Sequence, residues 1–398
     1  MFRMFLLSLC CLLLSATLPA FADELETVAG EELTGTVAAI SAQGEVTGEG
    51  LGRKVRLSEL RSWQRKKMPD ISPAKIVAEG HAGAKLQLES LLFDGNEFHT
   101  VSPSGLELTL PFDGLRALRF EPSASLAAFE EAFAKPAKDS DKIFLKVDKQ
   151  IETIAGLLAG ITATELSLDI SGEKRKIPRE RIYGIVFANA GGAPPPAALI
   201  SLTDGSRIAV KSLELQANVW RIQLVGGTKG EIAGESVSRI DFCPPGLVFL
   251  SDLEPAVVKE EPLFTSPAPW RRDQSVAGNT LQVGVRKFEK GLGVHARSEL
   301  SFDVPPESNW FLATIGIDEE TRSESTNLQN PAGDCEFRLL ADGRELFSAR
   351  VKGGEPPQTL RLELRNVKRL TLLVEPGEDF DFADHADWCD ARFLKLPK

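Results

Sequence analysis

A stretch near the end of the chain, FADHADWCDARF (Phe382–Phe393), concentrates side chains that could do chemistry. It places His385, Asp387 and Trp388 within four positions. An imidazole and a carboxylate beside an indole suit a metal centre, an acid–base pair, or a saccharide site in which the ring covers the apolar face of a sugar. The rim of a β-fold without any ligand is the competing interpretation.

The acidic loop around this stretch suggests a metal ion as one hypothesis. Asp379, Asp381 and Asp384 offer hard oxygen ligands on a Gly-containing loop, and such ligands suit a structural calcium ion. Their spacing differs from that of an EF-hand loop, so a solvated acidic loop is the alternative. His385 and Asp387 by themselves supply only half of a zinc site.

Catalysis by the same side chains is the weaker interpretation. A glycosidase needs two carboxylates about 5–10 Å apart across a cleft, and Asp318 with Asp387 is the candidate pair. No other region shows an acid–base pair, and the chain contains no P-loop, GxSxG or HExxH motif. We therefore expect that the chain is not an enzyme.

The first 22 residues have the features of a signal peptide. They combine the positive charge of Arg3 with an apolar run, MFLLSLCCLLLSATL, and the small-x-small sequence Ala20-Phe21-Ala22. We expect cleavage near Ala22 and a secreted or periplasmic protein. No other run is long and apolar enough to span a membrane. The formal net charge of −11 disfavours binding to nucleic acid.

Residues 23–245 read as repeated small β-units. Three segments end alike, namely FDGLRALRF at Phe120, PRERIYGIVF at Phe187 and ESVSRIDF at Phe242, and a weaker copy precedes Trp63. Alternating apolar and polar residues before each ending predict strands. In strand count and length these units resemble Sm-like or SH3-like barrels. No motif in them predicts chemistry, so we expect a spacer or a docking platform for a protein partner.

The chain therefore divides into five segments. After the signal peptide (residues 1–22) we expect two small β-units in 23–123, a short helix and linker in 124–142, two further β-units in 143–245, and a β-sandwich in 246–396. The overall fold class is all-β.

The last segment predicts a sandwich through its strand pattern. Strands with alternating or fully apolar residues follow each other without a helical period, which is typical of sandwiches. The seven segments are ELSFDV, FLATIGID, EFRLLAD, RELFSARV, LRLELRNV, LTLLVE and ARFLKL. Cys335 and Cys389 lie in this segment and either form a disulfide or remain buried thiols.

Three runs in this segment resemble the NPCBM domain family, which is related to the family 51 carbohydrate-binding modules. They are KGLGVHA (Lys290–Ala296), GIDEE (Gly316–Glu320) and DHADW (Asp384–Trp388), in this order. The resemblance covers residues 247–396. It implies a jelly-roll, galactose-binding-like sandwich that holds a glycan, with a terminal galactose-type sugar as the natural ligand.

The predicted carbohydrate site consists of polar side chains and one indole on the loops of this sandwich. His295, Asp387 and Trp388 are carried over from the family pattern, each with a structural alternative: a strand tie, a turn cap and a core plug. The full set of candidates is His295, Asp318, Arg322, His385, Asp387 and Trp388. We expect a secreted, non-enzymatic carbohydrate-binding protein; the alternative is an extracytoplasmic scaffold protein without affinity for sugar.

Overall fold

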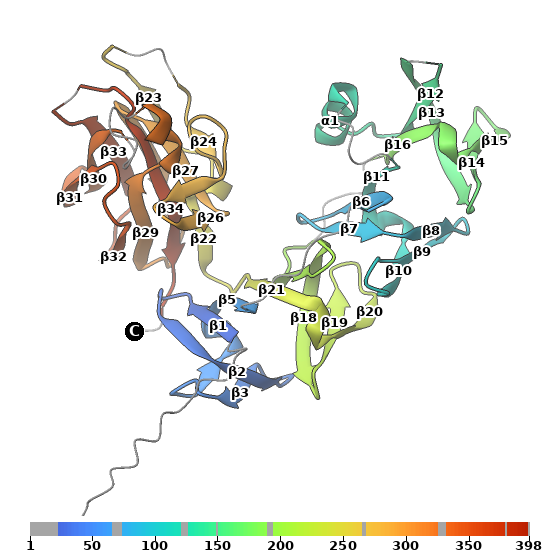
Figure 1. Ribbon diagram of the computed structural model, residues 1–398, viewed down its shortest axis with the longest axis horizontal. Helices are drawn as coiled ribbons and strands as arrows, with labels where there is room; N and C mark the ends of the chain where they lie inside the picture. Colours follow the sequence, from blue (N-terminus) through green and yellow to red (C-terminus); the bar gives the residue numbers. More distant parts are fainter. Residues whose placement is uncertain are drawn as a thin grey trace, which may run out of the picture. The chain divides into compact units, whose positions relative to one another are not determined.

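The computed structural model describes residues 23–65, 74–120, 126–148, 150–188, 194–264, 268–324, 332–378 and 380–396. The chain divides into an N-terminal part (Met1–Glu26 and Glu32–Phe242) and a C-terminal part (Thr27–Glu31 and Cys243–Lys398). Strands dominate both parts (Figure 1). The predicted signal peptide lies outside the described residues. No described helix combines the length and the apolar character that crossing a membrane would require.

The N-terminal part is built from four β-units that repeat one order of elements. β-unit 1 contains β1 (Asp23–Thr27), β2 (Glu32–Ile40), β3 (Glu45–Glu49), β4 (Val55–Arg56), η1 (Leu57–Glu59) and β5 (Leu60–Arg65). β-unit 2 contains β6 (Ile76–Gly80), β7 (Lys85–Leu88), β8 (Ser90–Phe93), β9 (Glu97–Val101), β10 (Glu107–Pro111), η2 (Phe112–Gly114) and β11 (Leu115–Arg119).

The other two β-units follow the same order. β-unit 3 contains β12 (Asp141–Val147), β13 (Gln150–Ile161), β14 (Glu165–Ile170), β15 (Glu173–Pro178), η3 (Arg179–Arg181) and β16 (Ile182–Val186). β-unit 4 contains β17 (Ala198–Leu202), β18 (Arg207–Gln216), β19 (Val219–Leu224), β20 (Lys229–Ala233), η4 (Gly234–Ser236) and β21 (Val237–Phe242). The recurring sequence endings thus correspond to a 3₁₀ turn and the last strand.

Each β-unit brings its last strand back to its first. β5 pairs with β1, β11 with β6, β16 with β12, and β21 with β17. The second strand is bent, by a register shift in β2, β13 and β18 and by the break between β7 and β8. A bend and a first-to-last pairing let a short sheet curl onto itself. The specific likeness to Sm or SH3 barrels stays a prediction.

Buried carboxylates support two of these bends. Asp23 Oδ2 accepts a hydrogen bond from Val37 N at 2.8 Å, and Asp141 Oδ2 accepts one from Leu158 N at 2.9 Å. Both acceptors stand at the start of the first strand of their β-unit. Burial raises the pKa of both carboxyls. The bulge N–H groups, which have no ladder partner, are thereby satisfied inside the fold.

The β-units pair with each other through their last strands. β5 of β-unit 1 runs beside β21 of β-unit 4, and β11 of β-unit 2 runs beside β16 of β-unit 3. The helix α1 (Ala127–Ala134) ends before Pro136 and buries Phe129 against Phe144 and Tyr183. One apolar cluster runs through all four β-units.

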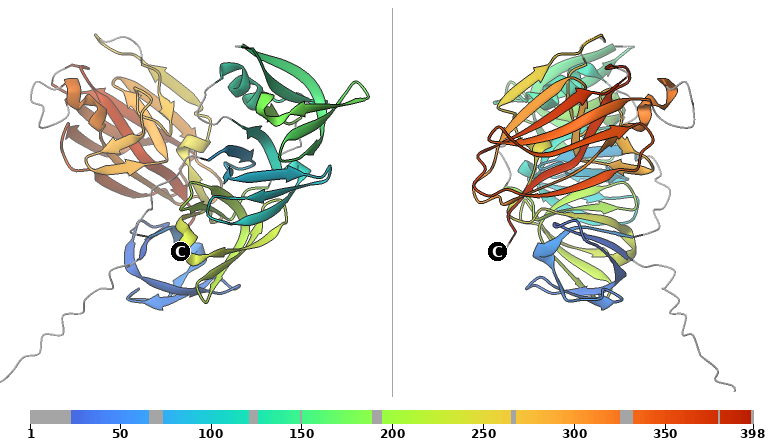
Figure 2. Two further views of the ribbon diagram at one scale, coloured as in Figure 1. Left: turned by 45° about the vertical axis from the view of Figure 1, so that its right-hand side comes forward. Right: turned by 90° about the vertical axis from the view of Figure 1, so that its left-hand side faces the viewer.

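The C-terminal part contains a six-stranded and a five-stranded antiparallel sheet, which form two layers (Figure 2). One sheet has the order β24 (Arg271–Arg272), β27 (Gly291–His295), β34 (His385–Leu394), β29 (Trp310–Ile317) and β32 (Gln358–Glu363), and β22 (Leu247–Phe249) also pairs with β34. The other has the order β23 (Val257–Glu260), β28 (Ser298–Asp303), β33 (Arg369–Pro376), β30 (Asp334–Ala341) and β31 (Arg344–Lys352). The remaining elements are η5 (Leu250–Asp252), η6 (Glu319–Glu324) and a hairpin of β25 (Leu281–Val283) and β26 (Arg286–Phe288).

The sandwich confirms the predicted fold class and all seven predicted strands. Its core lies between the sheets and includes Phe311, Phe337, Phe393 and Trp388. Of the two alternatives for Cys335 and Cys389, the structure has the buried thiols, and no disulfide joins them. Cys335 belongs to the core between the sheets, whereas Cys389 packs on the opposite face of its strand, beneath the β25–β26 hairpin.

Candidate functional site

The predicted site residues meet at one end of the sandwich. β27 ends at His295 opposite His385, where β34 begins, and β29 ends at Ile317 opposite Ala386. In the other sheet β28 begins at Ser298 opposite Val374, near the end of β33. We call this the loop end; its described residues are 261–264, 268–270, 296–297, 318–324, 332–333, 353–357, 377–378 and 380–384.

A polar cluster at the loop end centres on Glu320. His385 Nδ1 lies 2.7 Å from Glu320 Oε1, Asn279 Nδ2 donates to Oε2 at 2.9 Å, and Ala277 N donates to Oε1 at 3.1 Å. Ser275 Oγ also donates to Oε2. Burial acts to raise the pKa of Glu320, but these hydrogen bonds outweigh it and lower the pKa to about 2. The ionised carboxylate therefore holds the 275–279 turn against His385.

Asp318 and Asp387 form a buried carboxyl pair beside this cluster. Asp318 Oδ2 accepts from Gln282 N at 2.9 Å and Oδ1 accepts from Glu320 N at 2.8 Å. Burial, with the charge of Asp318 added, raises the pKa of Asp387 well above its ordinary value. Two close carboxyls away from water resist ionising together, so the protonated form of Asp387 is favoured. Both side chains are inaccessible to a ligand in this conformation.

Two glycines explain why Asp387 is covered. It pairs with Gly293 on one side and Gly316 on the other. A Cβ at Gly293 would lie 2.4 Å from Gln274 O, and a Cβ at Gly316 would lie 2.2 Å from Val283 Cγ1. Only glycine lets these chain segments lie directly on the sheet above Asp387. The predicted glycosidase pair, Asp318 with Asp387, is thus covered by neighbouring chain segments. The two carboxyls do not face each other across an open cleft.

Trp388 does not form a sugar platform, which corrects the prediction from sequence. β34 begins at His385, so Trp388 lies within a strand and not on a loop before one. Alternation along the strand points Trp388 into the core, where its ring lies 5.1 Å from the ring of Phe337 and only 1% of the residue is exposed. The indole of Trp388 is therefore part of the hydrophobic core, as in the structural alternative given for it above.

The remaining candidates occupy mixed positions. His295 is buried, its ring lies 5.6 Å from that of His385, and its Nδ1 contacts Ala296 O. Arg322 pairs with Glu319 within η6, with 2.9 Å between Nε and Oε2. His295 and His385 thus adjoin the polar cluster, while the contacts of Arg322 are local. Sugar binding by these residues stays a prediction.

The acidic residues proposed as calcium ligands serve as backbone acceptors. Asp381 Oδ2 accepts from Leu263 N at 2.7 Å and from Phe264 N at 3.1 Å, and Asp384 Oδ1 accepts from Asp334 N at 2.8 Å. Asp379 lies outside the described residues. Among the residues that are described, no three His, Cys, Asp or Glu side chains are placed to hold a metal ion. The described carboxylates bind loops together, and calcium binding by Asp379, Asp381 and Asp384 stays a prediction.

Sequence reasoning missed an exposed aromatic group at the loop end. Phe264 is 65% exposed, and Phe380 and Phe382 are each 55% exposed. The ring of Phe264 lies 5.0 Å from that of Phe380 and 6.4 Å from that of Phe382, with which it stacks. We call these three rings the phenyl patch. The signal in the sequence was the alternation Phe380-Asp381-Phe382, which places one ring on each side of the buried Asp381.

Asp381 fixes the phenyl patch. Its carboxylate is fully buried and accepts hydrogen bonds from the 263–264 backbone, while its neighbours Phe380 and Phe382 point their rings outward. One side chain therefore ties the 261–270 connection to the 377–384 connection. A ring cluster held in this way loses little conformational entropy when a ligand covers it.

Charged donors and acceptors stand at the same end. Arg350 Nε donates to Asp334 Oδ1 at 2.6 Å and its Nη1 donates to Glu378 Oε1 at 2.9 Å. The Arg350 guanidinium lowers the pKa of Asp334 and of Glu378. Glu378, two positions before Phe380, is exposed. The loop end thus combines apolar ring faces with ionised groups that bind hydroxyls in fixed directions.

The comparisons with known proteins concern the C-terminal part. Residues 246–394 match the NPCBM/NEW2 domain family. A protein of Renibacterium salmoninarum, named provisionally as an endo-alpha-N-acetylgalactosaminidase, is 33% identical over 118 residues, which is 29% of this chain and 7% of that protein. An alpha-1,3-galactosidase B of Akkermansia muciniphila is 26% identical over 125 residues, which is 30% of this chain and 15% of that protein. The chain thus spans a small fraction of either relative.

Solved structures similar to this chain include carbohydrate-binding modules. A family 51 carbohydrate-binding module of Clostridium perfringens in complex with methyl-galactose is 22% identical, with a TM-score of 0.32, and the alignment covers 37% of this chain and 99% of the module. A second C. perfringens structure, with GlcNAc bound to such a module, is 22% identical with a TM-score of 0.34 and covers 48% of this chain and 40% of that chain. Residues 246–394 of this chain form an NPCBM domain.

Proposed function

We propose that this chain binds carbohydrate at the loop end of its NPCBM domain, with the phenyl patch as the platform for the sugar ring. The observation that carries the proposal is the exposure of Phe264, Phe380 and Phe382 together at one end of the sandwich. Contiguous exposed apolar surface on a soluble domain marks an interaction site. The family match makes a glycan the ligand to expect there.

The chemistry of the loop end suits a pyranose. One face of the sugar presents C–H groups, which pack on the negative faces of phenyl rings. The hydroxyls around the ring need directional partners, and Arg350 and Glu378 supply a donor and an acceptor at the same end of the sandwich. The polar cluster of Glu320 and His385 acts behind the surface, where it holds the loops in place.

We extend the proposal to the whole chain as a secreted, non-enzymatic protein. The two acids of the predicted catalytic pair are covered, and Asp387 holds a proton beneath backbone that the glycines admit. The relatives named above carry the names of an N-acetylgalactosaminidase and a galactosidase, so terminal galactose and N-acetylgalactosamine are the first sugars to test.

A glycan array with the purified chain from residue 23 onward tests the proposal. The double variant Phe380→Ala/Phe382→Ala is compared with wild type and with Leu346→Ala, which removes an exposed apolar side chain on β31. We expect wild type and Leu346→Ala to share glycan signals that the double variant loses while its circular dichroism spectrum is unchanged. A blank array for wild type, together with a protein captured through the phenyl patch, would instead favour the scaffold function.

A further inference from the structure

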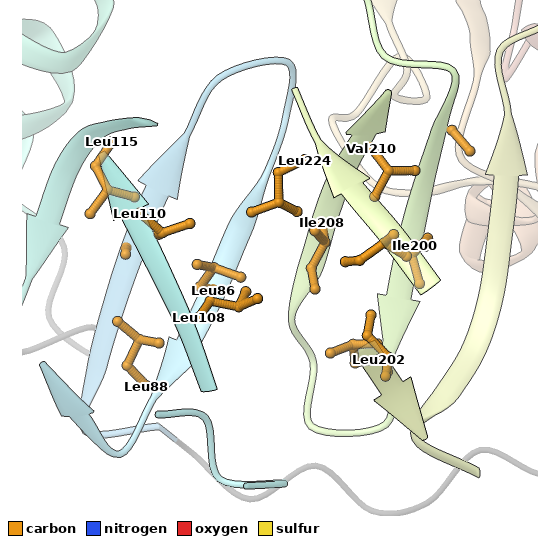
Figure 3. Packing of buried hydrophobic residues seen from close by; sticks show 14 of the residues in the cluster. Leu86, Leu88, Leu108, Leu110, Leu115, Ile200, Leu202, Ile208, Val210 and Leu224 are labelled. Carbon is orange, nitrogen blue, oxygen red and sulfur yellow. The ribbon is translucent and has the colours of Figure 1, made fainter. Parts of the chain in front are cut away.

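A cavity of about 240 Å³ lies between β-unit 2 and β-unit 4, and none of its lining residues belongs to the NPCBM domain. Its walls come from β7, β10 and the start of β11 on one side and from β18 and the end of β19 on the other. Figure 3 shows the side chains of Leu86, Leu108 and Leu110 on one side and Ile208 and Leu224 on the other.

The lining is aliphatic. Leucine, isoleucine, valine, alanine and proline supply most of it, and no Phe, Trp or Tyr is among the lining residues that the structure describes. The wall therefore offers mainly dispersion contacts, without ring faces for stacking. An apolar cavity of about 150 Å³ already holds a benzene molecule, while drug-sized pockets begin near roughly 300 Å³. A short flexible hydrocarbon matches a space between these limits.

Polar contacts on two sides keep the walls of this cavity apart. On one side Ser104 Oγ donates to Asp204 Oδ2 at 2.6 Å, and Gln87 N donates to Ser206 Oγ at 3.0 Å. On the other side Thr228 Oγ1 donates to Thr109 O at 3.0 Å. Both sets join β-unit 2 to β-unit 4. Because these contacts fix the spacing of the two walls, the leucines cannot close the space by moving together.

We propose that this cavity binds an aliphatic chain, with the polar end of the ligand at Asp113. His81 and Asp113 supply charged or polar groups to the lining, with His81 Nε2 2.9 Å from Asp113 O, and the Asp113 side chain is exposed. An acidic side chain at the opening of a protein with net charge −11 disfavours an anionic head group. A neutral amphiphile therefore binds more tightly than the corresponding carboxylate.

Gly226 and Gly114 provide variants that fill the cavity. A Cβ at Gly226 would lie 3.6 Å from Pro111 Cγ, and one at Gly114 would lie 3.5 Å from Pro111 Cδ, both ordinary contact distances. Neither glycine has a positive φ, so a larger residue fits the backbone. Gly160 is the matched control, since its Cβ would also make only ordinary contacts and it lies in β-unit 3, outside the cavity.

Calorimetric titration of the chain from residue 23 onward with octan-1-ol and with octanoate tests the proposal. We expect one saturable site for octan-1-ol in wild type and in Gly160→Leu, weaker binding of octanoate, and at least tenfold weaker binding of octan-1-ol in Gly226→Leu and in Gly114→Leu. Thermal unfolding of each variant confirms that it is folded. The proposal is overturned if wild type shows no saturable binding, or if both cavity variants bind as wild type does. Glycan binding at the loop end is unaffected by either result.

Discussion

The two parts of this protein place their aromatic side chains in opposite ways. The N-terminal part repeats one small β-unit and turns its aromatic residues inward; in its described residues the exposed large apolar side chains are Leu92 and Leu157. The NPCBM domain is a single sandwich that turns three phenyl rings outward on anchored loops. The comparison indicates that a fold made of repeated units can form a cavity between two of the units. A single sandwich offers no such space and binds its ligand on its loops.

The largest effects are expected from the two buried indoles, one in each part. Trp220 packs against Trp63 at a ring distance of 5.6 Å, and Trp388 packs against Phe337. Replacing either by Ala removes a fully buried ring, which costs about 3–5 kcal/mol of unfolding free energy. Chemical denaturation should show Trp220→Ala weakening the transition of the N-terminal part and Trp388→Ala that of the NPCBM domain. If the folded Trp388→Ala variant bound sugar more weakly than wild type, the indole would be part of the sugar site after all.

An intermediate effect is expected from the anchor of the phenyl patch. Asp381→Ala removes the acceptor of the Leu263 and Phe264 N–H groups, and lost hydrogen bonds to a charged group cost about 1–3 kcal/mol. We expect a lower melting temperature and weaker glycan binding together, because the three rings no longer share one support. Asp113→Ala, at an exposed acid in the N-terminal part, is the control and should change neither. Full glycan affinity in Asp381→Ala would show that the patch needs no anchor.

A smaller, pH-dependent effect is expected from the covered carboxyl pair. The folded-state pKa of Asp387 is raised, so its contribution to stability is fully present below the ordinary value of 3.8 and is lost as the pH rises through the raised pKa. Asp387→Asn keeps a neutral group of the same shape and should flatten this decline in melting temperature with rising pH. A variant whose pH profile ran parallel to that of wild type would mean that Asp387 is ionised in the fold.

Glu320 has the opposite effect on the pH dependence of stability, because its pKa is lowered in the fold. Because its pKa falls from 4.5 to about 2 in the fold, the stability that it contributes is present above 4.5 and is lost as the pH falls toward 2. Glu320→Gln should remove this acid-side decline for the NPCBM domain. The decline with rising pH that Asp387 causes should remain in that variant, which separates the two groups.

The smallest effect on stability is expected at the phenyl patch itself. Phe382→Ala trims an exposed side chain, and surface substitutions of this kind usually change stability by within about 0.5 kcal/mol. Leu92→Ala, at an exposed position of the N-terminal part, should behave alike in thermal unfolding. The two variants should differ only when glycan is present, since ligand stabilises wild type and Leu92→Ala but not Phe382→Ala.

The sandwich could be predicted from the sequence because apolar and polar residues alternate along its strands. The predicted site was less accurate, because one strand begins earlier than its pattern indicates. The polar run Asp384-His385 reads as a loop, whereas pairing with β27 and β29 extends β34 back to His385. That shift moves Trp388 from a loop into the core. Periodicity alone could not reveal it, because Asp387 is a buried acid, and the burial and the Asp318 partner that raise its pKa exist only in the fold.

The phenyl patch and the cavity lay beyond sequence reasoning for a different reason. Phe380 and Phe382 are apolar residues in an acidic loop, and their exposure depends on where Asp381 finds its backbone partners, more than 100 positions away at Leu263 and Phe264. The cavity likewise depends on contacts between separate β-units, such as Ser104 with Asp204. Long-range pairing decides both features, and a local pattern carries no information about it.

The most direct test is to observe the sugar on the rings. Nuclear Overhauser effects are measured between the ring protons of a bound galactoside and the phenyl protons of the chain, assigned by their loss in Phe380→Ala and in Phe382→Ala. The account predicts contacts from the sugar to Phe380 and Phe382. Contacts to other side chains, with none to these two rings, would contradict it.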